Sequence, residues 1–273
     1  MLRGADHEQH ELLHMTRDGK QPMHKMSGRP ICIDLNSDLG EGAGHDAEVM
    51  PLITSVNIAC GAHAGDDSLM AATVALARRH AVAIGAHPGH ADREHFGRRE
   101  IAMGSAAAAA LVTAQIARLA ECAGPMLHHV KLHGGLYHQV SRDVADADAV
   151  ATAIAARWPH LVLYALAGSV LAARARAAGL VVAEEAFIDR AYAVDGSLVP
   201  RSWPGGLIGE PSEAAARAVT LATRGRVRAI DGSEIRVTAD TLCIHGDGPN
   251  PVATARAVRV ALAAAGITVT ADR

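Results

Sequence analysis

The chain has 273 residues, 49% hydrophobic and 20% charged, so it can bury a sizeable core in one large domain or two small ones. Its net charge of −3 and its 3% of aromatic residues argue against a nucleic-acid partner, because no basic block neutralises phosphates and no aromatic series stacks on bases. Its four cysteines form no C-x-x-C pair, which favours buried reduced thiols in a cytoplasmic protein.

The first 28 residues are polar and lack the apolar segment of a secretion signal. Their histidines are His7, His10, His14 and His24. We expect a flexible extension, or a translated leader before a start at Met23 or Met26, with metal binding as a minor alternative. Residues 29–273 are then expected to form a single catalytic domain.

Apolar strands and helices alternate along residues 29–273. Strands are predicted in chain order at residues 31–33, 55–60, 81–86, 127–132, 161–165, 180–183 and 241–244. Helices are predicted at residues 67–80, 105–124, 143–157, 169–179 and 211–223, with a last helix ending near residue 265. The uncharged run at 101–117 contains Ser105, Thr113 and Gln115, so we expect a buried helix and no membrane span. Residues 192–210 are rich in proline and glycine and are predicted to be a lid loop, and 234–238 a short strand outside the pattern.

This β-then-α pattern repeats about seven times, which predicts an α/β fold with parallel strands covered by helices. The length and the repeat number favour a closed or nearly closed TIM-like (β/α) barrel of about seven strands. An open doubly wound sheet is the alternative. Both architectures place the functional site at the carboxyl ends of the strands.

Polar residues follow six of the predicted strands at the point where each strand ends. They are Asp34, Asn36, Asp38 and Glu41, then Asn57 and His63, then His87, then Lys131 and His133, then Glu185, Asp189 and Arg190, and finally His245 and Asp247. A single histidine at a strand end is more often structural than functional. Because a parallel barrel brings all these ends to one rim, we expect the six groups to face one cavity.

These residue types suit proton transfer, cation binding and anion binding. Histidine exchanges protons near neutral pH, and Asp with His can bind a divalent metal, for which Asp34, Asp38 and His63 are the best candidates. The one H-E-x-x-H match, His10 to His14, lies in the N-terminal extension, so metal binding in the barrel is the minority interpretation. Lys131 could hold an anion, as could Arg98, Arg99, Arg190 and Arg201. The chain has no phosphate-binding G-x-x-x-x-G-K-[ST] motif and no G-x-S-x-G elbow.

Six ordered blocks from residue 31 to the C-terminal helix resemble the LamB/YcsF family. They read IDLNSDLGEGAG, SVNIACGAHAGDD, IGAHPGHADREHFGRR, VKLHGGLYHQV, EEAFIDRAYAVDGSLVPR and IHGDGPNPVATARAV. The resemblance implies a barrel of the glycoside hydrolase/deacetylase class. It also implies a component of the bacterial ATP-dependent 5-oxoprolinase, which hydrolyses 5-oxo-L-proline to L-glutamate and forms ADP and phosphate. It further implies two partner subunits, B and C, in a cytoplasmic complex, without membrane or nucleic acid.

For that reaction the expected catalytic residues are Asp34, Asp38, Glu41, His63, His133 and His245. The expected substrate-binding residues are Asn36, Asn57, His87, Lys131, Asp189, Arg190 and Asp247. Carboxylates with His63 would act as base or orient water, His133 and His245 would be acids, and Lys131 and Arg190 would hold an anion. ATP is expected as co-substrate, bound by this chain or by a partner. Two alternatives stay open: a metal-dependent deacetylase or amidase acting alone, and a non-catalytic subunit that binds the lactam.

Overall fold

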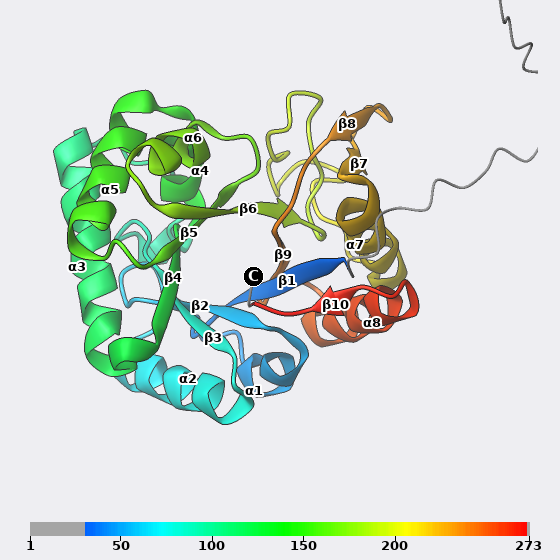
Figure 1. Cartoon of the computed structure of the whole chain (residues 1–273), viewed down its shortest axis with the longest axis horizontal. Coiled ribbons are helices and arrows are strands. Elements are labelled where there is room, and N and C mark those ends of the chain that lie inside the picture. Colours follow the sequence, from blue (N-terminus) through cyan, green and yellow to red (C-terminus); the bar gives the residue numbers. More distant parts are fainter. Residues whose placement is uncertain (1–30, 272–273) are drawn as a thin grey trace, which may run out of the picture.

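The structure, a computed structural model, describes residues 31–271, so the N-terminal extension and its four histidines lie outside the described residues. Seven parallel strands form a closed ring (Figure 1). They are β1 Cys32–Leu39, β2 Ser55–Ala59, β3 Ala83–His87, β4 Leu127–Lys131, β5 Val162–Leu166, β6 Val181–Phe187 and β9 Thr241–His245. Each strand pairs with the next in this order, and the pairing of β1 with β9 closes the ring. The prediction of a closed (β/α) barrel is therefore confirmed, and the open sheet is wrong.

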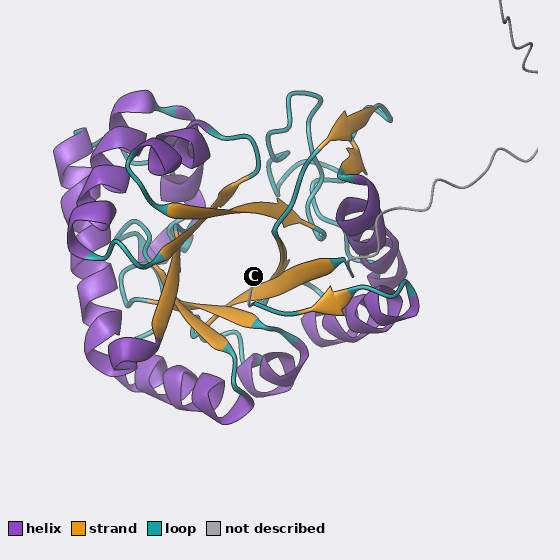
Figure 2. Cartoon of the chain, viewed as in Figure 1, coloured by secondary structure: helices purple, strands orange, loops and turns teal. Residues whose placement is uncertain are grey.

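Helices cover the outside of the ring (Figure 2). They are α1 Asp46–Val49, α2 Asp67–His80, α3 Ser105–Ala123, α4 Gly134–Arg142, α5 Val144–Arg157, α6 Val170–Ala177, α7 Pro211–Arg224 and α8 Pro251–Ala264. Local sequence fixes several of their ends. The side chains of Asp66, Asp143 and Ser169 accept hydrogen bonds from backbone N–H groups in the first turns of α2, α5 and α6. Proline is the first residue of both α7 and α8, where its missing N–H costs nothing.

Helix α3 is long and apolar enough to span a membrane by length and composition alone. Its buried residues include Ala108, Val112, Ile116 and Leu119, which lie on one side of the helix. That side packs on the barrel at β3 and β4, and the helix also contacts α5. Helix α3 therefore covers part of the barrel wall, in agreement with the predicted buried helix.

Three segments lie outside the ring of seven strands. Strand β10 (Thr268–Val269) pairs with the beginning of β1. Strands β7 (Arg226–Arg228) and β8 (Glu234–Arg236) form a small antiparallel pair, of which the sequence predicted only the second. The residues between β6 and α7 form a long loop, drawn in teal in Figure 2, that is tied across itself by isolated bridges.

Strands β1 and β6 continue beyond the residues predicted for them. Hydropathy ended the first strand at Ile33, before its first carboxylate, yet the strand runs to Leu39. Alternate residues of a strand point to the same side, so Asp34, Asn36 and Asp38 share a side, and all three bond to residues of other barrel strands. The barrel interior is thus polar, and this is why an apolar pattern stops short of the true strand ends.

Candidate functional site

The carboxylate of Asp34 lies inside the barrel, toward the N-terminal ends of the strands. Its oxygens accept hydrogen bonds from the hydroxyls of Thr54, Ser55 and Thr241 at 2.6, 2.8 and 2.6 Å. It faces the N-terminal end of the barrel, where it lines a separate cavity of about 300 Å³. Asp38 lies four residues further along the same strand, or about 13 Å away. The structure therefore does not bring Asp34 to the rim, and three hydroxyl donors give it a structural role.

Lys131 fills the middle of the barrel. Its ammonium nitrogen lies 2.8 Å from Asp38 Oδ1, 2.8 Å from Glu185 Oε1 and 3.0 Å from the sulfur of Cys243. Burial opposes the charge of Lys131, but Asp38, Cys243 and Glu185 outweigh it and hold its pKa well above the usual value. The lysine is thus an internal cation that neutralises the carboxylates around it.

Asp38 lies at the upper end of this network. Burial alone would raise the pKa of its carboxyl, but His87 and Lys131 hold that pKa well below its usual value. The side-chain amide of Asn57 donates to Asp38 Oδ1 and to Asn36 Oδ1, each at 2.8 Å. Asn36 and Asn57 are fully buried, so the structure places these two predicted substrate-binding residues behind Asp38, where they orient it.

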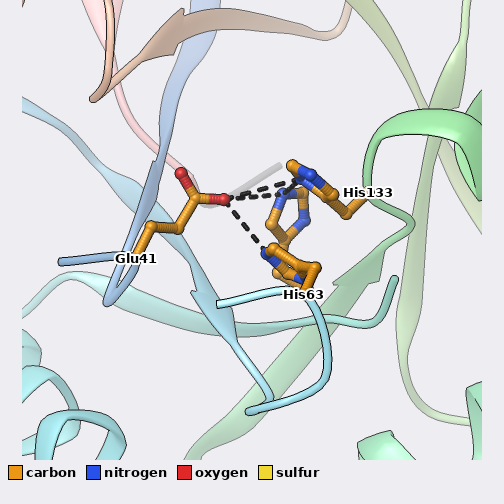
Figure 3. Close-up of side chains that lie close together, drawn as sticks. Glu41, His63 and His133 are labelled. Carbon is orange, nitrogen blue, oxygen red and sulfur yellow. Dashed lines mark hydrogen bonds and ion pairs between the residues drawn. The ribbon is translucent and has the colours of Figure 1, made fainter. Parts of the chain in front are cut away.

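Above Asp38 a second group gathers, which we call the Glu41 cluster: Glu41, His63, His87 and His133. It draws on the segments that follow β1, β2 and β4 and on the end of β3. Glu41 Oε1 lies 3.2 Å from His63 Nε2, 3.8 Å from His87 Nε2 and 3.5 Å from His133 Nδ1. Figure 3 shows the glutamate pointing at the imidazole rings. All four side chains are at least nine-tenths buried.

Burial governs the protonation of the Glu41 cluster as it stands without a bound cation. Desolvation and the neighbouring Asp38 raise the pKa of Glu41 well above its usual value. Desolvation, with the neighbouring His87, lowers the pKa of His63 to about 2. Desolvation, with His63 and His87, holds the pKa of His133 well below its usual value. Burial therefore disfavours the charged forms of Glu41, His63 and His133 unless a cation joins them.

The rings of His63 and His133 are stacked, with centroids 3.8 Å apart and planes 5° from parallel. This stack depends on two glycines beside it. A Cβ on Gly89 would lie 2.8 Å from His63 Nδ1, and a Cβ on Gly97 would lie 2.6 Å from His63 Cβ. Gly97 also has φ +64°, a conformation that glycine adopts without strain.

A third group pairs Asp189, which follows β6, with His245 at the end of β9, the strand that pairs with β1. His245 Nδ1 lies 2.9 Å from both carboxylate oxygens of Asp189, and its ring stacks on Phe187. Burial lowers the pKa of His245 although Asp189 acts in the opposite direction. The ring is thus neutral near pH 7, with Nδ1–H donated to Asp189 and Nε2 left as a proton acceptor.

Positive charge gathers on the same side as Asp189. Asp247 forms ion pairs with Arg98 and, at 3.2 Å, with Arg201. Arg190 is 5% exposed and donates to the carbonyl oxygen of Val199 at 2.7 Å. Its Nε has no hydrogen-bond partner, and among residues 31–271 no carboxylate forms an ion pair with it. Burial lowers the pKa of Arg190 to about 10, so it remains a cation with a spare donor.

Some members of each of these groups line one cavity of about 720 Å³ at the carboxyl ends of the strands. Residues on its surface include Asp38, His87, Lys131, His133, Arg190 and His245. The loop predicted to cover the site forms a wall of this cavity, through residues such as Ser197, Arg201 and Ser202. The expectation that polar strand ends share one cavity thus holds for these residues. Some of them, such as Lys131, lie inside the barrel and not at its rim.

The sequence reasoning passed over several residues of this site. Tyr137 donates to Glu185 Oε2 at 2.8 Å, and the buried His129 contacts Asn57 at 2.9 Å through Nε2. Cys243 was predicted only as one of four buried reduced thiols. The period of two offered a signal for Cys243, which precedes His245 by two residues in the same strand. Tyr137 gave no such signal, because it lies on α4, a helix that was not predicted.

The chain is similar to proteins of known family over most of its length. The model of the LamB/YcsF family matches residues 33–273. The chain is 49% identical over 247 residues to a protein of Heliobacterium modesticaldum that is named as the A component of 5-oxoprolinase, a match that covers 88% of this chain and 97% of the relative. It is equally identical to the protein of that name from Thermus thermophilus, with 88% and 99% covered.

Solved structures agree with the sequence comparisons. The lactam utilization protein from Thermus thermophilus superposes with a TM-score of 0.81 at 48% identity, covering 88% of this chain and 99% of that one. An uncharacterized protein from Agrobacterium tumefaciens superposes with a TM-score of 0.52 at 13% identity, covering 90% and 89%, which is a likeness of fold alone.

Proposed function

This chain belongs to the LamB/YcsF family, and on that premise we propose that it opens the lactam ring of 5-oxo-L-proline as one component of an ATP-dependent 5-oxoprolinase. The products would be L-glutamate, ADP and phosphate. Relatives that are 49% identical are named as the A component of 5-oxoprolinase, and the chain covers 97–99% of their length. The observation that carries the proposal is a single cavity in which a spare buried cation, Arg190, faces the same space as His245, whose ring is held by the carboxylate of Asp189.

Arg190 suits the carboxylate of the lactam. 5-Oxoproline presents one carboxylate on a small ring, and a guanidinium binds a carboxylate through charge-assisted hydrogen bonds whose fork geometry matches the two oxygens. The side chain has a spare donor at Nε and no carboxylate paired with it in the described part of the chain. We infer that the substrate supplies the missing anion.

The Asp189–His245 pair suits the proton transfers of amide hydrolysis. Asp189 fixes the tautomer that leaves His245 Nε2 free to take a proton from water as the water oxygen bonds to the lactam carbon. The same nitrogen then returns the proton to the ring nitrogen as the carbon–nitrogen bond breaks. One residue thereby serves as base and then as acid, which extends the acid role expected for His245.

ATP is proposed to activate the lactam oxygen by phosphorylation before the water attacks, because an unactivated five-membered amide is a poor electrophile. Breakage of the carbon–nitrogen bond then leaves an acyl phosphate, and its hydrolysis by a second water molecule releases phosphate and L-glutamate. Arg98 and Arg201, held by Asp247 at the cavity, are the cations that could neutralise a transferred phosphoryl group. Subunits B and C are the proposed partners, and the complex is proposed to be cytoplasmic. The nucleotide would bind in this complex, on this chain or on a partner.

The test is glutamate formation from 5-oxo-L-proline and ATP, with this chain, B and C mixed together and with each omitted in turn. We expect glutamate and ADP only from the full mixture. Glutamate formed in the absence of this chain would contradict the proposal. Lactam or amide hydrolysis by this chain alone, without ATP, would favour a stand-alone amidase. Stoichiometric binding of 5-oxoproline without loss of turnover in His245→Asn would favour a subunit that only binds.

A further inference from the structure

The Glu41 cluster is built differently from the other polar groups of the barrel. Lys131 neutralises Asp38 and Glu185, and two arginines neutralise Asp247. Within residues 31–271, by contrast, every ion-pair contact of Glu41 is with a histidine. A buried carboxylate surrounded by imidazoles has no permanent cation.

Hydrogen bonds to backbone carbonyls fix the tautomers of two rings in the cluster. His133 Nε2 lies 2.7 Å from the carbonyl oxygen of Phe96, and His87 Nδ1 lies 2.9 Å from the carbonyl oxygen of Lys131. A carbonyl oxygen only accepts, so each of these two nitrogens carries a hydrogen. In the neutral rings the opposite nitrogens, His133 Nδ1 and His87 Nε2, then have lone pairs and no hydrogen.

Those two bare nitrogens face each other at 3.0 Å. Glu41 Oε1 faces both of them, at 3.5 and 3.8 Å. Asp38 Oδ2, another acceptor, lies 3.4 Å from the same His87 nitrogen. Acceptors that converge in a dry interior repel one another unless a cation lies between them.

The spacing of these atoms matches the coordination of a transition metal. A tetrahedral ion bound at about 2.0–2.1 Å holds its ligand atoms about 3.3 Å from each other. The three distances among Glu41 Oε1, His87 Nε2 and His133 Nδ1 are 3.0, 3.5 and 3.8 Å, which surround that value. Imidazole and carboxylate together are ligands typical of Zn²⁺ sites.

We propose that Glu41, His87 and His133 bind one divalent metal ion of the zinc type, with a fourth coordination position open to the cavity. The opening follows because His87 and His133 both line the 720 Å³ cavity. Three protein ligands with one open position are the arrangement of catalytic rather than structural zinc sites. Such an ion would polarise an oxygen atom of a molecule bound in the cavity.

His63 is assigned a positioning role beside this ion. Its ring is parallel to that of His133 at 3.8 Å, so the lone pairs of the two rings run side by side and do not converge on one point. Its Nε2 lies 3.2 Å from Glu41 Oε1 and would donate a hydrogen bond to the ionised carboxylate. Removal of His63 should therefore weaken metal binding less than removal of a ligand.

A second candidate group, Asp38 with Cys243 and His245, provides the comparison. These three side chains also come close enough to share an ion. The ammonium of Lys131 already lies 2.8 Å from Asp38 and 3.0 Å from the Cys243 sulfur. A metal ion there would have to displace a buried cation, and so we assign the ion to the Glu41 cluster alone.

The experiment measures metal binding by the purified full chain, without substrate or partners. The metal-free protein is titrated with Zn²⁺ and, in parallel, with Co²⁺, whose visible absorption reports the coordination geometry. We expect one equivalent of either metal, with a tetrahedral or five-coordinate Co²⁺ spectrum. Glu41→Gln and His133→Asn should each weaken binding at least about 100-fold, and His63→Asn about 10-fold. The control, His245→Asn, should retain wild-type affinity.

Failure to bind a stoichiometric metal ion would overturn the assignment, since a proton would then have to take the place of the ion among these acceptors. Equal loss in His245→Asn and His133→Asn, or full affinity in Glu41→Gln, would also overturn it. Circular dichroism of each variant separates loss of ligand from loss of fold, and the wild-type Co²⁺ spectrum decides the question without any variant. The assignment does not rest on the proposed reaction, because these readouts involve no turnover.

Discussion

The ammonium nitrogen of Lys131 lies 2.8 Å from Asp38 Oδ1 inside the barrel, where both side chains are almost fully buried. A buried ion pair adds little stability by itself, because both charges give up water to form it. Breaking one is costly, because the remaining charge has no partner. Lys131 serves two carboxylates, Asp38 and Glu185, so its removal leaves two buried charges without their cation.

Lys131→Met should therefore destabilise the fold by about 3–5 kcal/mol near pH 7.5. The measurement is urea-induced unfolding followed by circular dichroism. In the wild type the depressed pKa of Asp38 contributes stability above its unfolded-state pKa, and this stability is lost as pH falls. Without Lys131 the pKa of Asp38 rises, so the variant gains stability relative to the wild type as pH falls. A stability deficit that is small, or that grows toward acid pH, would contradict this account of Lys131.

Asp189→Asn tests the pair that is proposed to move protons. Without the carboxylate, the tautomer of His245 is no longer fixed, and we expect kcat of the assembled enzyme to fall about 100-fold or more. Asp189 opposes the lowering of the pKa of His245 by burial, so its removal should lower that pKa further. Because the base must be unprotonated, the acidic limb of the pH–rate profile should move to lower pH. An acidic limb that stays in place would exclude His245 as the base.

Arg190→Gln tests the proposed site for the substrate carboxylate. Hydrogen bonds to charged groups are worth about 1.5–3 kcal/mol, so KM for 5-oxoproline should rise roughly 10- to 100-fold, with a smaller change in kcat. 2-Pyrrolidinone, which lacks the carboxylate, should inhibit the variant and the wild type equally. Arg226→Ala is the control, because Arg226 is exposed and pairs with Glu234 on the small β7–β8 sheet. An unchanged KM in Arg190→Gln would place the carboxylate elsewhere.

Gly97→Ala tests the backbone that supports the stacked histidines. Two effects combine there: the left-handed φ of +64° and the approach of a new Cβ to within 2.6 Å of His63. Gly179→Ala is the matched control, because Gly179 has φ +87° and a Cβ added there would meet nothing within 4 Å. We expect the control to lose about 1–2 kcal/mol of unfolding free energy and Gly97→Ala to lose about 1–3 kcal/mol more. Equal losses would mean that the stack does not constrain Gly97.

The barrel could be predicted from the sequence, because strands and helices alternate and many of the helices carry a capping or terminating residue. The start of α3 at Ser105 and the end of α2 at His80, for example, were both predicted. Strand length was harder to predict. Hydropathy assumes that a strand faces apolar neighbours on both sides, and β1 carries Asp34, Asn36 and Asp38 into a polar interior where other side chains satisfy them.

The site was predictable in part, for a related reason. Strand ends mark the rim, and so His87, His133 and His245 could be assigned to one cavity. The sequence did not show how far each polar residue lies from the rim along the barrel axis. For this reason Asp34 was grouped with Asp38, which lies about 13 Å away. Nor could the sequence show that His63 stacks on His133, or that Glu41 has only histidines as ion-pair partners in the described chain, since both depend on how several loops pack.

The most direct test of the central claim, that the lactam is opened in this cavity, is glutamate formation by the complete enzyme assembled with His245→Asn in place of the wild-type chain. Co-purification of B and C with the variant shows that assembly is intact. We predict that glutamate formation falls at least about 100-fold while the variant chain still binds 5-oxoproline. Glutamate formation at the wild-type rate would contradict the claim and would place the chemistry on a partner subunit.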